Sequence, residues 1–176
     1  MEHVKNLTLR AILAAAICVI APLSIPSGAI PVTLASLIIY VISACTQVKF
    51  SVPAVTIYIL LGCFGLPVFS GFTGGFQIVS GITGGYIISY VPCSAVISQL
   101  CDRFSNKKTI FPFSMILATL ICYVCGTLWY VFQTNSTFVA AISVCILPFI
   151  LGDILKITVA TCICVALRPK LYKILK

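Results

Sequence analysis

Two charged side chains stand three residues apart inside an apolar stretch near the C-terminal end of the sequence. Asp153 and Lys156 are the only acid and base that lie within the apolar stretches. On a helix, positions i and i+3 share one face, so the two groups can neutralise each other. A carboxylate accepts N–H donors and an ammonium group donates to a carbonyl, so together they complement the edge of a cyclic urea or amide. Ionisable residues within membrane segments usually serve function, which favours a ligand site over a structural ion pair.

A second candidate site is a glycine-rich repeat. Residues 70–79 (SGFTGGFQIV) and 80–89 (SGITGGYIIS) match at six of ten positions. Glycine at this density permits positive φ angles and a close approach of the backbone to a ligand, and successive N–H groups in such turns can bind an anion. The alternative is a packing loop without ligand contact. The candidate contacts of this segment are Ser70, Gly71, Thr73, Gln77 and Tyr86.

The sequence lacks the signatures of most enzymes. It contains no nucleophile–base pair, no cluster of metal ligands and no nucleotide motif, since the glycine repeat is neither a P-loop nor part of a βαβ unit. The ten cysteines lie mostly in apolar runs and are interpreted as small hydrophobic side chains. We therefore predict that the chain is not an enzyme and holds no catalytic residue, metal or cofactor.

The elements that position these residues are predicted to be membrane helices. Hydrophobic residues make up 61% of the chain and charged residues only 8%, whereas a soluble domain carries about a quarter charged residues. The apolar runs are continuous rather than alternating, which favours helices over strands. We predict an all-α integral membrane protein, a single polytopic domain over residues 1–176, with six transmembrane helices at residues 9–25, 31–48, 52–66, 84–100, 110–132 and 148–167.

The basic residues set the predicted orientation. They occur before the first helix, between the second and third, between the fourth and fifth, and after the sixth, whereas the other three connections contain no charged residue. By the positive-inside rule both termini are cytoplasmic, and the glycine-rich loop between helices 3 and 4 is on the outer side. The net charge of +8 follows this distribution, so no nucleic-acid partner is predicted. The cations are Lys5, Arg10, Lys49, Arg103, Lys107, Lys108, Arg168, Lys170, Lys173 and Lys176.

The predicted sixth helix begins at a proline. Pro148 lacks an N–H and cannot continue a helix from the preceding residues, so residues 138–147 are predicted to form a separate short segment near the outer surface. Asp153 and Lys156 then lie in the first two turns of the sixth helix, in the outer part of the membrane. Trp129 and Tyr130 fall at the outer interface, where amphipathic rings are favoured.

The first predicted helix has a face of small residues. Ala11 and Ala15 are four residues apart, which allows another helix to approach closely. Packing within the chain and docking to a partner both remain open from this pattern.

Several of these segments together resemble one family. The stretch Gly65-Leu66-Pro67-Val68-Phe69-Ser70-Gly71, continuing to Thr83-Gly84-Gly85-Tyr86, resembles the BioY family, the biotin-specific substrate-binding (S) components of energy-coupling factor (ECF) transporters. Pro148-Phe149, followed by Gly152-Asp153 and Lys156, resembles the second motif of that family, and Pro31-Val32-Thr33-Leu34 resembles a third. The resemblance runs from Arg10 to Arg168.

The resemblance implies high-affinity capture of biotin at the outer face of the cytoplasmic membrane and ATP-driven uptake. The partners would be biotin, membrane lipid, a transmembrane coupling subunit that docks on Ala11 and Ala15, and two ATPase subunits. Asp153 would accept the ureido N–H groups, and Lys156 would meet either the ureido carbonyl or the carboxylate. The valerate tail would lie near Thr73 and Tyr86. The implied ligand contacts are Asp153, Lys156, Thr73, Tyr86, Gly71, Ser70, Gln77 and Thr33.

Three other functions remain open at this stage. They are an S component for another small vitamin, a self-sufficient carrier or channel that uses Asp153 and Lys156 as a gate, and a structural membrane subunit without a ligand. The sequence also departs from the family pattern at Ala35, Phe72, Ile82 and Leu151. These departures concern the shape of the pocket rather than the fold.

Overall fold

The chain folds into a bundle of helices with a small strand pair at one end. The computed structural model describes residues 2–25, 30–104 and 107–175, with the side chains of 2, 3, 170 and 172–175 excluded, so Lys170, Lys173 and Lys176 of the predicted orientation lie outside it. The elements in chain order are α1 (Glu2–Ile20), β1 (Ser24–Ile25), β2 (Val32–Thr33), α2 (Ala35–Cys45), α3 (Val48–Cys63), the 3₁₀ turn η1 (Ser70–Phe72), α4 (Phe76–Ser80), α5 (Gly84–Arg103), α6 (Ile110–Thr134), α7 (Phe138–Cys145) and α8 (Ile150–Leu175).

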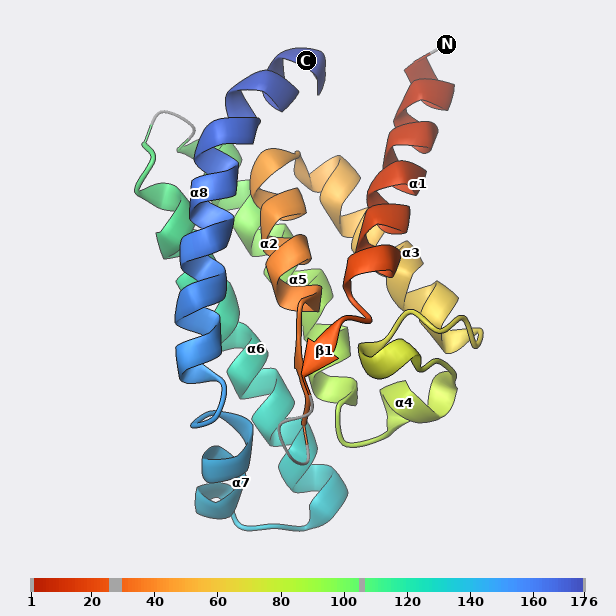
Figure 1. Ribbon diagram of the computed structural model, residues 1–176, viewed down its shortest axis with the longest axis vertical. Coiled ribbons are helices and arrows are strands. Elements are labelled where there is room, and N and C mark those ends of the chain that lie inside the picture. Colours follow the sequence, from red (N-terminus) through yellow and green to blue (C-terminus); the bar gives the residue numbers. More distant parts are fainter. Residues whose placement is uncertain (1, 26–29, 105–106, 176) are drawn as a thin grey trace.

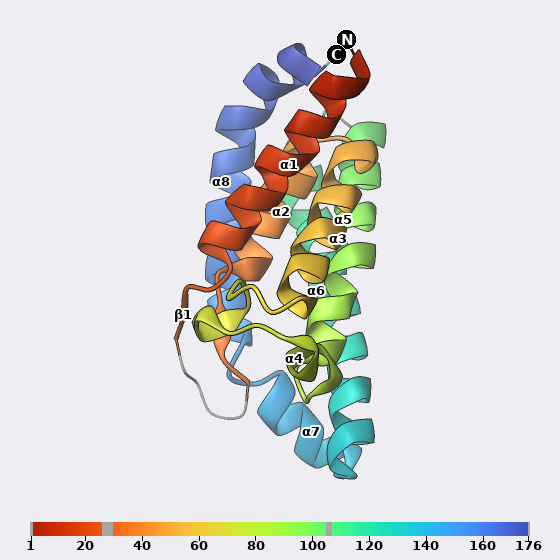
Figure 2. The same ribbon diagram turned by 90° about the vertical axis from the view of Figure 1, so that its right-hand side faces the viewer.

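The long helices run side by side along the vertical axis of Figures 1 and 2. The start of α1 and the end of α8 lie at one end of the bundle, whereas α4, α7 and the strand pair lie at the opposite end. The glycine-rich segment and residues 138–147 therefore share the end away from the termini, which is the arrangement that the predicted topology requires.

The segment between the first two helices differs from the prediction. Helix α1 ends at Ile20 rather than at residue 25, and α2 begins at Ala35 rather than at residue 31. Between them β1 and β2 pair antiparallel, with Ser24 opposite Thr33. Prolines at positions 22, 26 and 31 cannot donate a helical hydrogen bond, and the residue before each is disfavoured in the helical region. The all-α prediction is therefore wrong for this hairpin.

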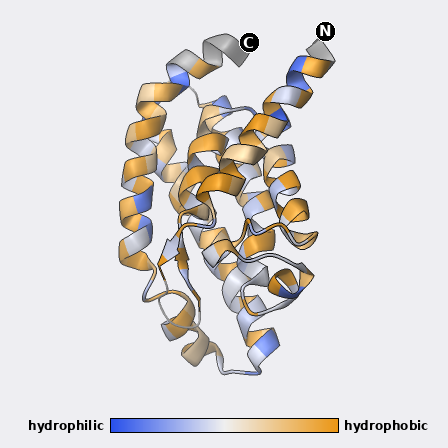
Figure 3. Cartoon of the chain, turned by 45° about the vertical axis from the view of Figure 1, so that its right-hand side comes forward, coloured by the Kyte–Doolittle hydropathy of each residue, from blue (hydrophilic) through white to orange (hydrophobic). Residues whose placement is uncertain are grey.

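In the part of the chain that the structure describes, three helices are long and apolar enough to cross a membrane by themselves, at Gly84–Arg103, Ile110–Thr134 and Ile150–Pro169. Two shorter helices, Ala35–Cys45 and Val48–Cys63, are also apolar. Many large apolar residues are exposed on the bundle, and hydrophobic residues run along most of its helices (Figure 3), as expected where lipid replaces water as the solvent. The count of six spans and the cytoplasmic position of the termini stay predictions.

Serine side chains join three helices inside the half of the bundle nearest to the ends of the chain. Ser43 of α2 donates to Ser94 of α5 at 2.9 Å, and Ser51 of α3 lies 2.6 Å from Ser98 of α5. Ser98 also donates to the Ser43 carbonyl at 2.8 Å. All four side chains are fully buried. Hydroxyl bonds of this kind hold membrane helices together, and here they fix α2, α3 and α5 beneath the cavity described below.

The predicted glycine loop is folded onto the end of α3. It contains the 3₁₀ turn η1 and the short helix α4 rather than irregular backbone alone. The Phe69 ring packs where a side chain at Gly62 would stand, and it meets Tyr58 edge-on with ring centroids 5.7 Å apart. Gly75, at a φ of 110°, turns the chain into α4 and donates its N–H to the Gly62 carbonyl at 2.7 Å. These contacts hold the segment over one end of the bundle.

Candidate ligand-binding site

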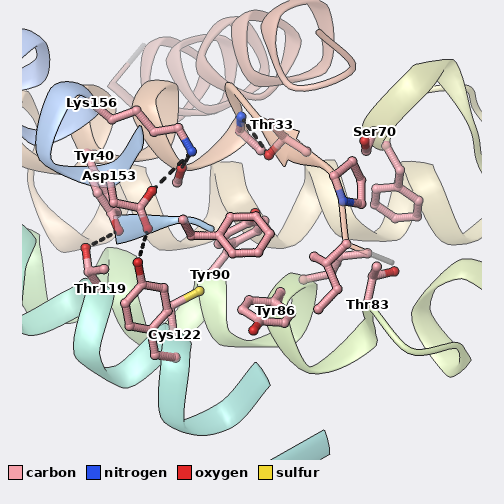
Figure 4. A pocket seen from close by; sticks show the side chains of 18 of the residues that line it. Thr33, Tyr40, Ser70, Thr83, Tyr86, Tyr90, Thr119, Cys122, Asp153 and Lys156 are labelled. Carbon is pink, nitrogen blue, oxygen red and sulfur yellow. Dashed lines mark hydrogen bonds and ion pairs between the residues drawn. The ribbon is translucent and has the colours of Figure 1, made fainter. Parts of the chain in front are cut away.

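A cavity lies between the glycine-rich segment, the strand pair and the first turns of α8. Its walls come from α2, α3, α5, α6 and α8 as well as from the connections that precede α2, α5 and α8. Figure 4 shows Asp153 and Lys156 at one end, Ser70 and Thr83 at the other, and Thr33, Tyr86 and Tyr90 between them. Among the described residues, the charged side chains that line this cavity are Asp153 and Lys156.

Asp153 lies in the first turn of α8, where the backbone N–H groups of the helix end favour negative charge. One carboxylate oxygen, Oδ1, pairs with Lys156 Nζ at 3.2 Å, and the other, Oδ2, accepts the Tyr123 hydroxyl at 2.6 Å. Only 9% of the Asp153 surface is exposed. The carboxylate is therefore held in a fixed orientation by donors from two helices before any ligand arrives.

Lys156 is also held on two sides. Its Nζ donates to Ser36 of α2 at 3.2 Å in addition to Asp153, and only 8% of the residue is exposed. Beside it, the Tyr40 and Thr119 hydroxyls lie 2.7 Å apart. This end of the cavity thus offers an oriented carboxylate, an ammonium group and several hydroxyls within an apolar wall, the combination by which a small polar ligand can be fixed.

The middle and the other end of the cavity are less polar. Aromatic and aliphatic side chains form most of the walls there, at Ile30, Pro31, Tyr58, Phe69, Ile78, Tyr86, Ile87, Tyr90 and Phe149. The polar groups there are hydroxyls. The Thr33 Oγ1 accepts the Ala35 N–H at the start of α2, and the Thr83 Oγ1 donates to the Ile78 carbonyl.

Five of the predicted ligand contacts line the cavity, at Thr33, Ser70, Tyr86, Asp153 and Lys156. The Tyr86 hydroxyl donates to the Cys145 carbonyl of α7 at 3.0 Å, and its ring packs where a side chain at Gly126 of α6 would stand. Tyr86 therefore contributes its ring to the cavity wall while its hydroxyl fastens α7.

The other three predicted contacts are exposed residues of the glycine-rich segment that do not line the cavity. The Gly71 N–H donates to the Pro22 carbonyl, which ties the segment to the end of the first helix. The Thr73 hydroxyl donates to the Ser70 carbonyl, and the Gln77 amide donates to the Gly74 carbonyl. All three bonds stabilise the fold of the segment.

The predicted ligand contacts omit seven hydroxyl-bearing residues of the cavity lining, at Ser36, Tyr40, Tyr58, Thr83, Tyr90, Thr119 and Tyr123. A periodic signal was available for most of them. Polar residues four positions apart share one helix face, and such pairs occur on α2 (36 and 40), on α5 (86 and 90) and on α6 (119 and 123). Each of these three helices turns one such pair toward the cavity.

The small-residue face of α1 points away from the bundle. Ala11 and Ala15 are exposed, whereas Ala14 and Ile17 on the opposite face are buried in the core. Packing within the chain is thus served by Ala14 and Ile17, and Ala11 and Ala15 remain accessible to another helix.

The sequence profile described as the BioY family matches residues 1–173. The chain belongs to the BioY family. The family resemblance predicted from the glycine-rich motif and from the motif around Asp153 is thereby confirmed.

Curated BioY relatives align with nearly the whole chain. "Biotin transporter BioY2" of Lactococcus lactis is 35% identical over 164 residues, which are 92% of this chain and 90% of the relative. "Biotin transporter BioY" of Thermotoga maritima is 34% identical over 170 residues, 93% of this chain and 96% of the relative. These relatives are named as transporters, in line with the prediction that the chain is not an enzyme.

A solved structure has the same fold as this BioY-family chain. It is described as the S-component for biotin from an ECF-type ABC transporter, and it superposes with a TM-score of 0.87 at 26% identity. The match covers 96% of this chain and 93% of that one. The helical bundle described above is therefore the fold of an S component.

Proposed function

We propose that this protein captures biotin in the cavity with high affinity from the outer face of the cytoplasmic membrane and serves as the S component of an ATP-driven ECF transporter. The observation that carries the proposal is the oriented carboxylate of Asp153, bonded to both Lys156 and Tyr123 inside a cavity of a BioY-family chain. A cyclic urea has two N–H donors and one carbonyl acceptor, which this end of the cavity complements.

In the proposed complex, the ureido N–H groups of biotin donate to Asp153, and the ureido carbonyl accepts from Lys156 or from a neighbouring hydroxyl such as that of Tyr40. The sulfur-containing ring lies between the aromatic side chains, of which Tyr86 and Tyr90 line the middle of the cavity. The valerate tail extends toward the hydroxyl end. Hydrogen bonds to a charged group contribute about 1.5–3 kcal/mol each, so most of the specificity resides at the ureido end.

The predicted topology and partners complete the proposal. Six transmembrane segments with both termini in the cytoplasm place the cavity at the outer surface, and α1 presents Ala11 and Ala15 to the coupling subunit. Two ATPase subunits then supply the energy for uptake. The exposure of both alanines, opposite a buried Ala14, supports a docking role over internal packing.

The first test is biotin binding to the purified protein, by titration calorimetry, in wild type and Asp153→Ala. We expect tight binding by the wild type and an affinity loss of at least about 100-fold in Asp153→Ala, because two charge-assisted hydrogen bonds are lost. Asp102→Ala is the matched control, since it removes a carboxylate that does not line the cavity. Equal, tight binding in all three proteins would exclude Asp153 as the ureido acceptor.

The second test separates binding from coupling. Ala15→Trp is expected to abolish biotin uptake by cells that contain the coupling and ATPase subunits, while the purified protein still binds biotin, because a large ring prevents close helix approach. Cys162→Trp provides the control, since Cys162 is an exposed residue of a different helix, α8. Normal uptake in the Ala15→Trp strain would contradict the docking role, and uptake without any ATPase subunit would identify the protein as a self-sufficient carrier.

A further inference from the structure

The two ends of the cavity differ in the kind of polar group that they offer. Asp153 and Lys156, the charged lining residues among those described, lie together at one end. At the other end the polar side chains are the hydroxyls of Ser70 and Thr83, with that of Thr33 nearer the middle. A ligand with a polar ring and an acidic tail, such as biotin, therefore meets charge at the ring end and only hydroxyls at the tail end.

Of the residues that the structure describes, no cation lines the tail end of the cavity. The sequence contains no Lys, Arg, Asp or Glu in residues 11–48, 50–101 and 109–152, which include the connections beside the cavity. Lys156 is the one nearby cation in the sequence, and its Nζ is already bonded to Asp153 and Ser36 at 3.2 Å each. A carboxylate at the hydroxyl end would thus have no ion-pair partner from this protein.

The cost of desolvation determines whether a ligand carboxylate can be buried at the hydroxyl end of the cavity. A carboxylate moved out of water without a charged partner loses much more hydration energy than a few neutral donors return, so it stays in contact with water. A carboxamide is neutral and loses far less. The walls at this end are mostly apolar, with Ile30, Pro31 and Ile78 among them, so they offer a charged tail no advantage over a neutral one.

We propose that the site recognises the ureido ring and is indifferent to the charge of the tail, so that ligands whose tail carboxylate is masked as an amide bind as well as biotin does. The substrate class is then cyclic ureas of the biotin type with either an acidic or a neutral tail. This inference rests on the proposed function, because it takes biotin as the ligand and Asp153 as the partner of its ring.

The test compares biotin with biotinamide, its primary carboxamide, by titration calorimetry on the purified wild-type protein. We expect the two dissociation constants to agree within about threefold, since no ion pair is lost with the amide. An affinity for biotinamide more than about 30-fold weaker than for biotin would overturn the inference, because it would mean that a cation, namely Lys156, receives the carboxylate. Failure of both ligands to bind the folded protein would refute the proposed function itself.

A variant that should bind biotin more tightly than biotinamide provides an independent test. In Ser70→Lys a cation is added at the hydroxyl end, and we expect biotin to be favoured over biotinamide by about tenfold, the strength of a new ion pair near the surface. Ser143→Lys is the matched control, since Ser143 is an exposed residue of α7 that does not line the cavity, and it should leave the ratio unchanged. An unchanged ratio in Ser70→Lys, with biotinamide still bound, would show that the tail does not reach this end and would overturn the inference.

Discussion

Helix α8 carries two ion pairs, one near each end, with the same separation and different surroundings. Lys156 Nζ lies 3.2 Å from Asp153 in the same helix, and both side chains line the cavity. Arg168 lies 3.2 Å from Asp102 of α5, and its guanidinium also donates to the Cys101 carbonyl at 2.6 Å. The first pair lies within α8 and so connects it to no other helix, whereas the second pair connects α8 to α5.

The comparison teaches that the distance within an ion pair does not reveal its role. Asp153 and Lys156 line a cavity that a ligand can fill. Arg168 is 6% exposed, and its guanidinium lies over the Phe111 ring of α6, 5.4 Å from the centroid. Neither Arg168 nor Asp102 lines the cavity. We therefore expect the Asp153–Lys156 pair beside the cavity (the outer pair) to govern binding and the Asp102–Arg168 pair (the inner pair) to govern stability.

The largest effect is expected from Lys156→Met. This change leaves the Asp153 carboxylate buried without its cation, and we expect biotin binding to weaken by about 3 kcal/mol, or roughly 100-fold. Titration calorimetry measures the loss, and the melting temperature in detergent checks that the protein is folded. Unimpaired binding would mean that the outer pair is as structural as the inner one.

The matched change at the inner pair, Arg168→Met, should lower the stability of the protein and leave its biotin affinity nearly unchanged. Losing the bonds to Asp102 and to the Cys101 carbonyl is expected to lower stability by about 2 kcal/mol, because Asp102 is partly exposed and recovers some hydration. Denaturant titration in mixed micelles measures this loss. Biotin affinity should stay within about threefold of the wild type, and a large loss of affinity would show that the two ends of α8 are coupled.

The smallest effect is expected from Tyr123→Phe. The hydroxyl donates to Asp153 Oδ2 at 2.6 Å, so its loss removes one of the groups that orient the carboxylate. We expect biotin affinity to fall by about 1 kcal/mol, roughly fivefold. Tyr130→Phe is the control, because Tyr130 is on the same helix and outside the cavity lining. An equal effect of both changes would show that the Tyr123 hydroxyl does not contribute to binding.

The long helices could be predicted from the sequence because their apolar runs are continuous. The helix predicted at residues 110–132 corresponds to α6 (Ile110–Thr134), and the helix predicted at residues 84–100 corresponds to α5 (Gly84–Arg103). The start of α2 could not be placed. Residues 31–34 follow one apolar run into α2, and the strand conformation of Val32–Thr33 depends on pairing with Ser24–Ile25, which the apolar pattern does not reveal.

The charged part of the site was visible in the sequence because ionised groups are rare in apolar stretches. Of the cavity tyrosines only Tyr86 was predicted as a contact, because the rotation of a helix decides which way a tyrosine points and the sequence does not reveal that rotation. Arg168 was assigned to a cytoplasmic cluster of cations, because the positive-inside rule counts charges and says nothing of their contacts.

One departure from the family pattern has a conformational basis. Phe72 stands where the family commonly has glycine, and the structure places it at a φ of 58°, in the left-handed region that glycine adopts without strain. A side chain in this region costs of order 1 kcal/mol. Phe72 is 62% exposed and does not line the cavity, so the departure affects the segment that covers the site rather than the contacts within it.

The buried serines of α2, α3 and α5 have an electrical consequence. Hydrogen bonds join the side chains of Ser43 and Ser94 and those of Ser51 and Ser98, and all four residues are fully buried. These hydroxyls therefore do not line a water-filled path for protons in this part of the bundle. We expect the protein to be silent in conductance measurements on planar bilayers. A cell can then keep many idle copies in an energised membrane without discharging the gradient that its other transporters depend on.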